Sequence, residues 1–193
     1  MDIGVDQYLL NDRLTLSGGF FWNHYRDMIV LGSSAANCGA SSCAENIGAV
    51  SAKGWEASVK YAVVKDVLFI KSLDVRAQYT NTLTRNLDQH PGNRAPRMPV
   101  DQWSMTISYQ PIDLVRINLE GRYVGSRFDD VNNQQSMRAF DVWNVSATYD
   151  VTDRVQTYLR ADNIFNEKYE EILFYGTAVR SIFAGLRVNY DVP

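Results

Sequence analysis

Hydrophobic and polar residues alternate without interruption over residues 114–125, LVRINLEGRYVG. A period of two is the pattern of a β-strand whose two faces meet different surroundings. One face is apolar enough for a protein core or for lipid, and the other carries charges suited to water. The apolar positions are Val115, Ile117, Leu119 and Tyr123, and the polar positions are Arg116, Asn118, Glu120 and Arg122.

The same alternation recurs along the chain and predicts nine strands with very little helix-type periodicity. The apolar faces carry aromatic residues near their ends, as at Trp103 and Tyr109 or at Trp143 and Tyr149. The sequence therefore predicts an all-β protein. The expected strands cover about residues 3–10, 13–30, 46–63, 69–85, 98–110, 114–126, 138–151, 154–163 and 179–191.

The connections between these strands alternate between short and long. Tight turns are expected at Asn11-Asp12, 64–67, 111–113 and 152–153, and long connections at 31–45, 86–97, 127–137 and 164–178. Several strands exceed ten residues, whereas strands in sandwiches are typically about five or six residues long. Long antiparallel strands with short turns at one end and long loops at the other are typical of an up-and-down transmembrane β-barrel wall.

In such a wall, Val115, Ile117 and Leu119 face lipid, and the alternate residues face a watery lumen. Charged residues of the other strands fall on the same inward face, where we expect a solvated, ion-paired lumen wall. These inward charges are Glu56, Lys60, Arg76, Arg116, Glu120, Arg122, Arg160 and Arg187.

Composition narrows the function classes. The chain has 193 residues, is 46% hydrophobic and has a formal net charge of −3, with Lys and Arg scattered among Asp and Glu. This disfavours disorder and nucleic-acid binding. No secretory signal, phosphate-binding loop or nucleophile elbow is present, and the two histidines, His24 and His90, lie far apart. The sequence predicts neither an enzyme nor a bound cofactor or metal.

Two cysteines, Cys38 and Cys43, lie in the small, polar segment GSSAANCGASSCAEN. A local disulfide in an oxidising compartment is the expected pairing. A zinc half-site is the competing interpretation, but no second pair of Cys or His completes four ligands.

The segment FDDVNNQQ could supply oxygen ligands to calcium from Asp129, Asp130, Asn132 and Asn133. Its spacing does not match a known calcium loop. A solvated loop is the favoured interpretation.

The last 39 residues, VQTYLRADNIFNEKYEEILFYGTAVRSIFAGLRVNYDVP, resemble the end of a TonB-dependent outer-membrane receptor. These receptors carry a DN-L-F-[ND]-x-x-Y box, then a long loop with Tyr-Gly and an Arg, then a final strand. Earlier, NIGAVSAKGWEASVKY and NRAPRMPVDQWSMTISYQP resemble two strand openings of the same family. The matching residues are Asp162, Asn163, Ile164, Phe165, Asn166, Tyr169, Tyr175, Gly176 and Arg180, with Gly54, Trp55 and Glu56 upstream.

The resemblance implies that residues 1–193 are the last nine strands of a barrel of about twenty-two strands, in the outer membrane of a Gram-negative bacterium. The plug domain, the signal peptide and the remaining strands are absent from the sequence, so we expect an open or curled sheet. The implied function is to form part of a receptor for active uptake of a ferric siderophore or cobalamin. TonB would act on that receptor through the plug. The implied partners are outer-membrane lipid, the missing N-terminal strands and plug, and the substrate.

Within this chain the resemblance favours long-loop residues as ligand contacts: Arg127, Phe128, Asp129, Phe174 and Tyr175. The sequence of the last two strands resembles the cobalamin-receptor branch of the family slightly more than the other branches. Two other functions remain as alternatives, a soluble β-sandwich binding module and a small self-closed outer-membrane pore. Dependence on detergent would separate the sandwich from the other two.

Overall fold

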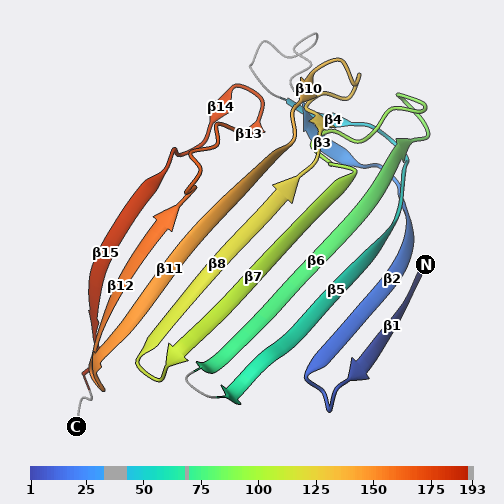
Figure 1. Ribbon diagram of the computed structural model, residues 1–193. Helices are drawn as coiled ribbons and strands as arrows, with labels where there is room; N and C mark the ends of the chain where they lie inside the picture. Colours follow the sequence, from blue (N-terminus) through green and yellow to red (C-terminus); the bar gives the residue numbers. More distant parts are fainter. Residues whose placement is uncertain (33–42, 68–69, 191–193) are drawn as a thin grey trace.

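The computed structural model describes residues 1–32, 43–67 and 70–190. Nine long strands form one antiparallel sheet in the order β1-β2-β5-β6-β7-β8-β11-β12-β15, each joined to its neighbour along the chain (Figure 1). Their bounds are β1 Asp2–Leu9, β2 Leu14–Tyr25, β5 Val50–Val67, β6 Ile70–Asn86, β7 Asp101–Ile112, β8 Val115–Val124, β11 Phe140–Thr152, β12 Val155–Asp162 and β15 Ser181–Val188.

Three small two-stranded hairpins lie in the long connections at one end of the sheet (Figure 1). They are β3 Ile29–Gly32 with β4 Cys43–Asn46, β9 Arg127–Phe128 with β10 Ser136–Met137, and β13 Glu170–Ile172 with β14 Tyr175–Gly176. At the opposite end of the sheet, the turns that the structure describes are short.

The nine predicted strands are therefore confirmed, and two of them differ most in extent. β5 runs from Val50 to Val67 where 46–63 was expected, so the turn expected at 64–67 is part of a strand. Its pairing with β6 shifts register between Ala62 and Val64, and pairing then continues as far as Val67. The expected strand over 13–30 ends at Tyr25, and residues from Ile29 onward belong to β3. Asp27 adopts a positive φ of 53°. That left-handed conformation is incompatible with a continuous strand, so the chain leaves the sheet there.

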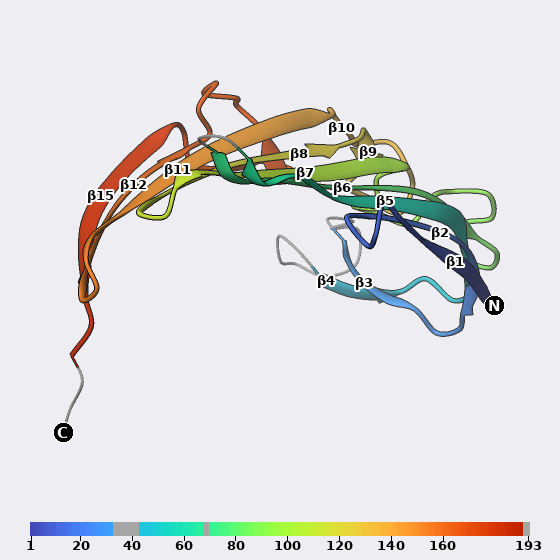
Figure 2. The ribbon, with the colours of Figure 1, turned by 60° about the horizontal axis from the view of Figure 1, so that its bottom comes forward.

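The sheet is arched and open (Figure 2). β1 and β15 are its two edges and do not pair with each other, so the sheet is not a closed pore. Nor do the described residues form two stacked sheets, as a sandwich requires. No helix in the described part of the chain is long and apolar enough to cross a membrane.

The register fixes which residues share a face of the sheet. The β3–β4 hairpin lies beneath the concave side (Figure 2), and Val30 and the preceding Met28 pack against a core that includes Val50. Val50 has the same parity along β5 as Glu56 and Lys60, so the polar face is the concave one.

The convex face is apolar between two rows of aromatic residues. In β5, β7 and β11 a Trp near the long-loop end is followed six residues later by a Tyr on the same face. The Trp row is packed: Trp103 lies 5.7 Å from Trp143, and Trp55 lies 4.8 Å from Tyr79, between ring centroids. The three pairs are Trp55 and Tyr61, Trp103 and Tyr109, and Trp143 and Tyr149.

Glycine makes room for one of these rings. A Cβ on Gly121 would come within 2.7 Å of the Trp143 indole, which lies across that position from the neighbouring strand. A larger residue at Gly121 would therefore displace Trp143 from the aromatic row.

The most buried hydrophobic cluster lies at the long-loop end of the sheet. Its core is Ile47, Val50, Ala95 and Val131, with Met28, Val30 and Met98 packed against it. These residues come from three different long connections and the start of β5. The connections are thus packed together and do not extend separately into solvent.

Candidate functional site

The four long connections at this end form the candidate functional site, which we call the loop cap. It comprises the described parts of 26–49 together with 87–100, 125–139 and 163–180. Beyond the hydrophobic cluster, hydrogen bonds join neighbouring connections. Asn93 Nδ2 donates to the Val131 carbonyl at 2.9 Å. At the end of β6, Asn86 Nδ2 donates to the Ile47 carbonyl at 3.0 Å and so ties the first connection to the sheet.

Asp129 joins three parts of the loop cap. Its carboxylate accepts two hydrogen bonds from Arg97, at 2.7 Å from Nε and 3.2 Å from Nη2, and lies 3.4 Å from the backbone nitrogen of Leu173. Asp129 is only 2% exposed. A two-pronged, charge-assisted contact of this kind fixes geometry as well as adding stability.

Asp130 shapes its own turn. Its carboxylate accepts hydrogen bonds from the backbone nitrogens of Asn132 at 3.1 Å, Gln134 at 3.0 Å and Gln135 at 2.7 Å. Asn133 Oδ1 accepts from the backbone nitrogen of Arg94 at 2.7 Å. These side chains are occupied in holding the loops, and the structure shows Asp130 to be buried and not solvated.

The described residues contain no group of three or more His, Cys, Asp or Glu side chains that could hold a metal ion. The calcium alternative for FDDVNNQQ therefore has no support in the geometry of the described residues, where its oxygens satisfy backbone donors of the same turn.

Arg127 is buried beneath the β13–β14 hairpin and is 3% exposed. Its Nη2 donates to the Glu170 carbonyl at 2.8 Å and to that of Glu171 at 3.3 Å, and its guanidinium lies 5.4 Å from the Phe140 ring centroid. Its Nη1 is buried and has no hydrogen-bond partner among the described residues. Burial lowers the pKa of Arg127, because removal from water disfavours its charged form.

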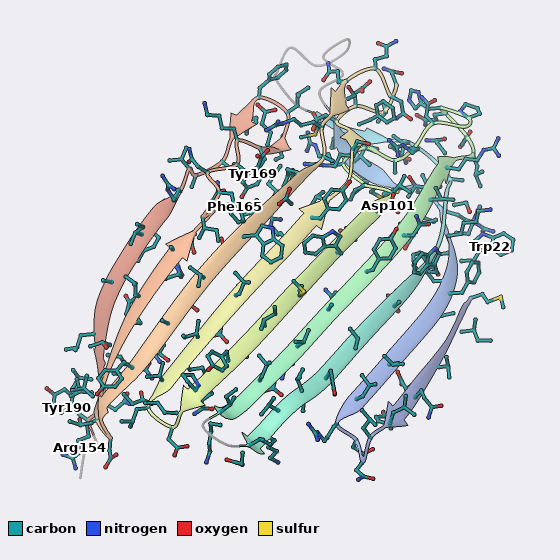
Figure 3. All side chains as sticks on the ribbon, in the orientation of Figure 1. Trp22, Asp101, Arg154, Phe165, Tyr169 and Tyr190 are labelled. Atoms are coloured by element: carbon teal, nitrogen blue, oxygen red, sulfur yellow. The ribbon has the colours of Figure 1, made fainter. Side chains whose placement is uncertain are left out.

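Arg122 and Tyr169 hold the other side of the same hairpin. Arg122 forms an ion pair with Glu171, and its guanidinium lies 5.3 Å from the Phe140 ring and 5.6 Å from the Tyr169 ring. The Phe140 and Tyr169 rings are 4.3 Å apart between centroids, and both Phe165 and Tyr169 lie at the end of β12 in Figure 3.

The box containing Asn163 is a local turn with a structural explanation. Asn163 has a positive φ of 51°, its Oδ1 accepts from the Glu167 nitrogen at 2.8 Å, and its Nδ2 donates to the Glu167 carbonyl at 2.9 Å. Asn tolerates this conformation better than most residues and also bonds its own backbone. The turn thus places the Tyr169 ring in contact with the Phe140 ring.

The five predicted ligand residues are brought together but differ in exposure. Phe174 and Tyr175 form the tip of the β13–β14 hairpin and are 84% and 67% exposed. Phe128 is half-buried with the Arg94 guanidinium 4.8 Å from its ring centroid, while Arg127 and Asp129 are buried below. The structure thus separates an exposed pair at the hairpin tip from a buried pair at its base.

The predicted disulfide stays a prediction, because Cys38 lies outside the described residues and only the backbone of Cys43 is described. Sequence reasoning gave no role to Arg97, Glu171 or Phe140. Their roles depend on contacts between distant segments. Tyr169 was recognisable from its place in the box, and Arg122 from its place on the polar face of its strand.

The concave face continues this polar character below the loop cap. A cavity of about 530 Å³ opens over β8, β11, β12 and β15. Arg160 lies there, 3.0 Å from Asp162 and with its guanidinium 4.7 Å from the Phe183 ring centroid. Of the eight predicted inward charges, Arg122 and Arg160 are the ones that form ion pairs within the described residues. The face is therefore charged and hollowed as predicted, but most of its charges are not ion-paired.

Comparisons with known proteins agree with this architecture. A family described as "TonB dependent receptor-like, beta-barrel" matches residues 1–164. The vitamin B12 transporter BtuB of Vibrio vulnificus (strain CMCP6) is 28% identical over 93 residues, which is 46% of this chain and 15% of that protein.

Solved structures with the same fold include the siderophore receptor PiuA from Acinetobacter baumannii, with a TM-score of 0.75 and 17% identity. The copper transporter OprC superposes with a TM-score of 0.73 and 16% identity. Each comparison covers 98% of this chain, but only 28% of the PiuA chain and 30% of the OprC chain.

The chain thus spans a small part of the length of its relatives, and the family match covers most of its own residues. The matched proteins are transporters and receptors, not enzymes. This chain belongs to the TonB-dependent receptor β-barrel family, whose members reside in the Gram-negative outer membrane.

Proposed function

We propose that residues 1–193 form part of the wall of a larger TonB-dependent receptor that takes up a scarce nutrient such as a ferric siderophore or cobalamin. The main support for this proposal is that both edges of the sheet are open. In lipid each unpaired backbone group costs several kcal/mol, so β1 and β15 require further strands. A nine-stranded segment of a larger barrel meets that requirement at both edges.

The faces of the sheet support an orientation for this wall. The apolar convex face, bounded by its two aromatic rows, suits contact with lipid, and the charged concave face suits a watery lumen that holds a plug. Long loops lie on the extracellular side of such barrels and short turns on the periplasmic side. The loop cap is therefore proposed to face the outside of the cell.

In this arrangement Phe174 and Tyr175 are proposed ligand contacts, because both are exposed at the tip of a hairpin that is anchored at its base. Arg127 and Asp129 are proposed to position the hairpin. Anchoring matters because a contact made by an already ordered loop loses less conformational entropy on binding. The wall itself performs no catalysis, and energy from TonB reaches the substrate through the plug.

The comparisons favour one of the two proposed substrate classes. Similarity in sequence to a vitamin B12 transporter favours cobalamin. The solved structures, at 16–17% identity, support the fold alone and leave a ferric siderophore as the second substrate class.

A chimera tests the proposal. Residues 1–193 would replace the corresponding strands of a BtuB-type receptor in a receptor-null strain, and uptake of radiolabelled cobalamin and of ferric siderophores would be measured. We expect uptake of one substrate class that disappears when TonB is deleted and falls when Phe174 and Tyr175 are changed to Ala. A chimera that reaches the outer membrane intact but takes up neither class would contradict the proposal.

A further inference from the structure

β7 is the central strand of the sheet, and its concave face carries small polar residues without charge (Figure 1). Gln102 pairs in register with Thr80, and Thr80 with Glu56, so the even-numbered residues from 102 to 110 lie on the concave face. All of them are Ser, Thr or Gln. We call them the β7 lane, which consists of Gln102, Ser104, Thr106, Ser108 and Gln110.

Charged residues border the β7 lane on both neighbouring strands. Thr106 lies in register between Arg76 of β6 and Glu120 of β8. Ser104 lies opposite Arg122 of β8. The β7 lane is thus a neutral stripe between strands whose concave faces are charged.

The β7 lane also differs from the concave faces of the more distant strands. Within the described residues, β2 is the other long strand with no charge on that face, and its concave positions include the rings of Phe21 and Tyr25. Each of the remaining long strands has at least one Asp, Glu, Lys or Arg there. A concave face made of hydroxyl and amide side chains alone is therefore particular to β7.

The β7 lane extends from the loop cap to the short turns. Its length from Gln102 to Gln110 is about 26 Å at about 3.3 Å per residue, which is close to the apolar band of about 25 Å in an outer-membrane barrel. A cavity of about 220 Å³ opens at its loop-cap end among Gln78, Thr80, Gln102 and Ser104. The β7 lane is thus long enough to cross the membrane and is hollowed where it begins.

The loop-cap end of the β7 lane lies beside the anchor of the β13–β14 hairpin. Arg122, which pairs in register with Ser104, forms the ion pair with Glu171 of that hairpin. The hairpin carries the two proposed ligand contacts, Phe174 and Tyr175. A molecule released from the hairpin therefore meets the beginning of the β7 lane.

The chemistry of the β7 lane suits transient contacts. Ser and Thr hydroxyls and the Gln amide can each donate and accept hydrogen bonds. Hydrogen bonds between neutral groups are about half as strong as those in which one group is ionised. A polar molecule that moves along β7 therefore finds partners at each step, and the strand itself has no ionised group on that face to retain it.

We propose that the β7 lane is the path along which the substrate crosses this part of the wall, from the loop cap to the short turns. This inference rests on the proposed function and deepens it. The occupant is a large polar molecule whose amide, hydroxyl or carbonyl groups exchange hydrogen bonds with successive residues. Ser104, Thr106 and Ser108 contact the substrate during transport and do not contribute to its initial binding by the loop cap.

Ser146 of β11 provides a matched control for Ser108. Both residues pair in register with Asn118 of β8, one from each side, so they lie at the same depth on the concave face. Both are half-buried. Ser146 lies opposite Arg160 on its other side and is outside the β7 lane. Because Ser108 Oγ donates a hydrogen bond to Asn118 Oδ1 at 2.8 Å, the amount of each variant in the outer membrane is measured together with its activity.

The first test uses the chimera described above, in which residues 1–193 complete a BtuB-type receptor. We expect Ser108→Trp to lower the rate of TonB-dependent uptake at least tenfold, because the indole fills the β7 lane, and to leave substrate binding to de-energised cells within twofold. Ser146→Trp should change neither quantity more than twofold. Equal uptake rates for the two variants would overturn the proposal. An unmodified chimera that takes up nothing would overturn the proposed function and the β7 lane with it.

A second measurement applies if Trp at either position prevents assembly. Single substitutions Ser108→Cys and Ser146→Cys are made in a chimera otherwise free of cysteine, with Cys38 and Cys43 replaced by Ser, and are labelled in energised cells with a small water-soluble methanethiosulfonate. Transport of substrate should slow the labelling of Ser108→Cys at least fivefold and leave that of Ser146→Cys unchanged, and deletion of TonB should abolish the protection. Equal protection at the two positions, or none at either, in a chimera that transports would overturn the proposal and leave the proposed function standing.

Discussion

The wall and the loop cap are stabilised by opposite kinds of contact. In the wall, neighbouring strands follow each other along the chain and pair in simple antiparallel register, with side chains sorted by parity onto two faces. In the loop cap, stability depends on side chains that join residues more than thirty positions apart, such as Arg97 and Asp129. The wall is thus specified by a repeated pattern, and the cap by individual residues. The effect of a substitution on stability should therefore depend, in the wall, on which face the residue occupies. In the cap it should depend on which partner the residue loses.

The largest expected effect is on the convex face of the wall. Leu119→Arg should destabilise the sheet in lipid by about 2–4 kcal/mol if the position is near the midplane, because Leu119 shares the apolar face with Val145 and Ile107. Asn118→Arg, one residue away on the concave face, should have a mild effect. Denaturant titration of the chain in lipid vesicles would measure the loss of unfolding free energy for both variants. Equal losses at the two positions would contradict the assigned orientation.

In the loop cap, Asp129→Ala should cost about 1.5–3 kcal/mol, the range for a hydrogen bond to a charged group. The loss leaves the Arg97 guanidinium, which is partly exposed, without its acidic partner. Limited proteolysis should show faster cleavage within 87–100 and 163–180 while the sheet stays intact. Cleavage that spreads into the wall strands, or no change at all, would contradict the separation of wall from cap.

Within the cap, substitutions can distinguish a residue that contacts the ligand from a residue that positions the β13–β14 hairpin. Phe174→Ala should change stability by less than about 0.5 kcal/mol, because the side chain is exposed, yet should weaken substrate binding. Arg127→Ala should weaken binding and also loosen the hairpin, because it removes the hydrogen bonds to the carbonyls of Glu170 and Glu171. Binding assays paired with hydrogen exchange at residues 170–176 would measure both effects. Normal binding by Phe174→Ala would remove that residue from the proposed contacts.

The smallest expected effect on stability concerns Cys38 and Cys43. A disulfide there closes a short loop, so it should restrict that loop more than it stabilises the fold. Alkylation with an iodoacetamide reagent under native, non-reducing conditions should leave both cysteines unmodified, because disulfide sulfurs do not react with it. Free reaction of both cysteines would show that the predicted bond is absent.

The wall could be predicted from sequence because its signal is local. Alternation over LVRINLEGRYVG assigns the faces of β8 without knowledge of its neighbours, and tight turns such as Thr152-Asp153 give the order of the hairpins. The early end of β2 was missed because Asp27 in a left-handed conformation leaves no periodic signal.

The loop cap could be predicted only in part. The exposed tip at Phe174 and Tyr175 follows from its place in a long loop, but the burial of Arg127 and Asp129 does not, because charged residues in loops are usually solvated. Their partners come from distant connections, and no periodicity in the sequence pairs Asp129 with Arg97 or Arg127 with Glu170.

The roles proposed for the wall and the loop cap both depend on which face of the wall meets lipid. Single cysteines placed in turn at residues 115 to 120, in a chain with Cys38 and Cys43 replaced by Ser, can be labelled in isolated outer membranes with a water-soluble maleimide. We predict alternation along β8, with labelling at 116, 118 and 120 and protection at 115, 117 and 119. Uniform labelling at all six positions, or alternation of the opposite phase, would contradict the placement of the convex face in lipid.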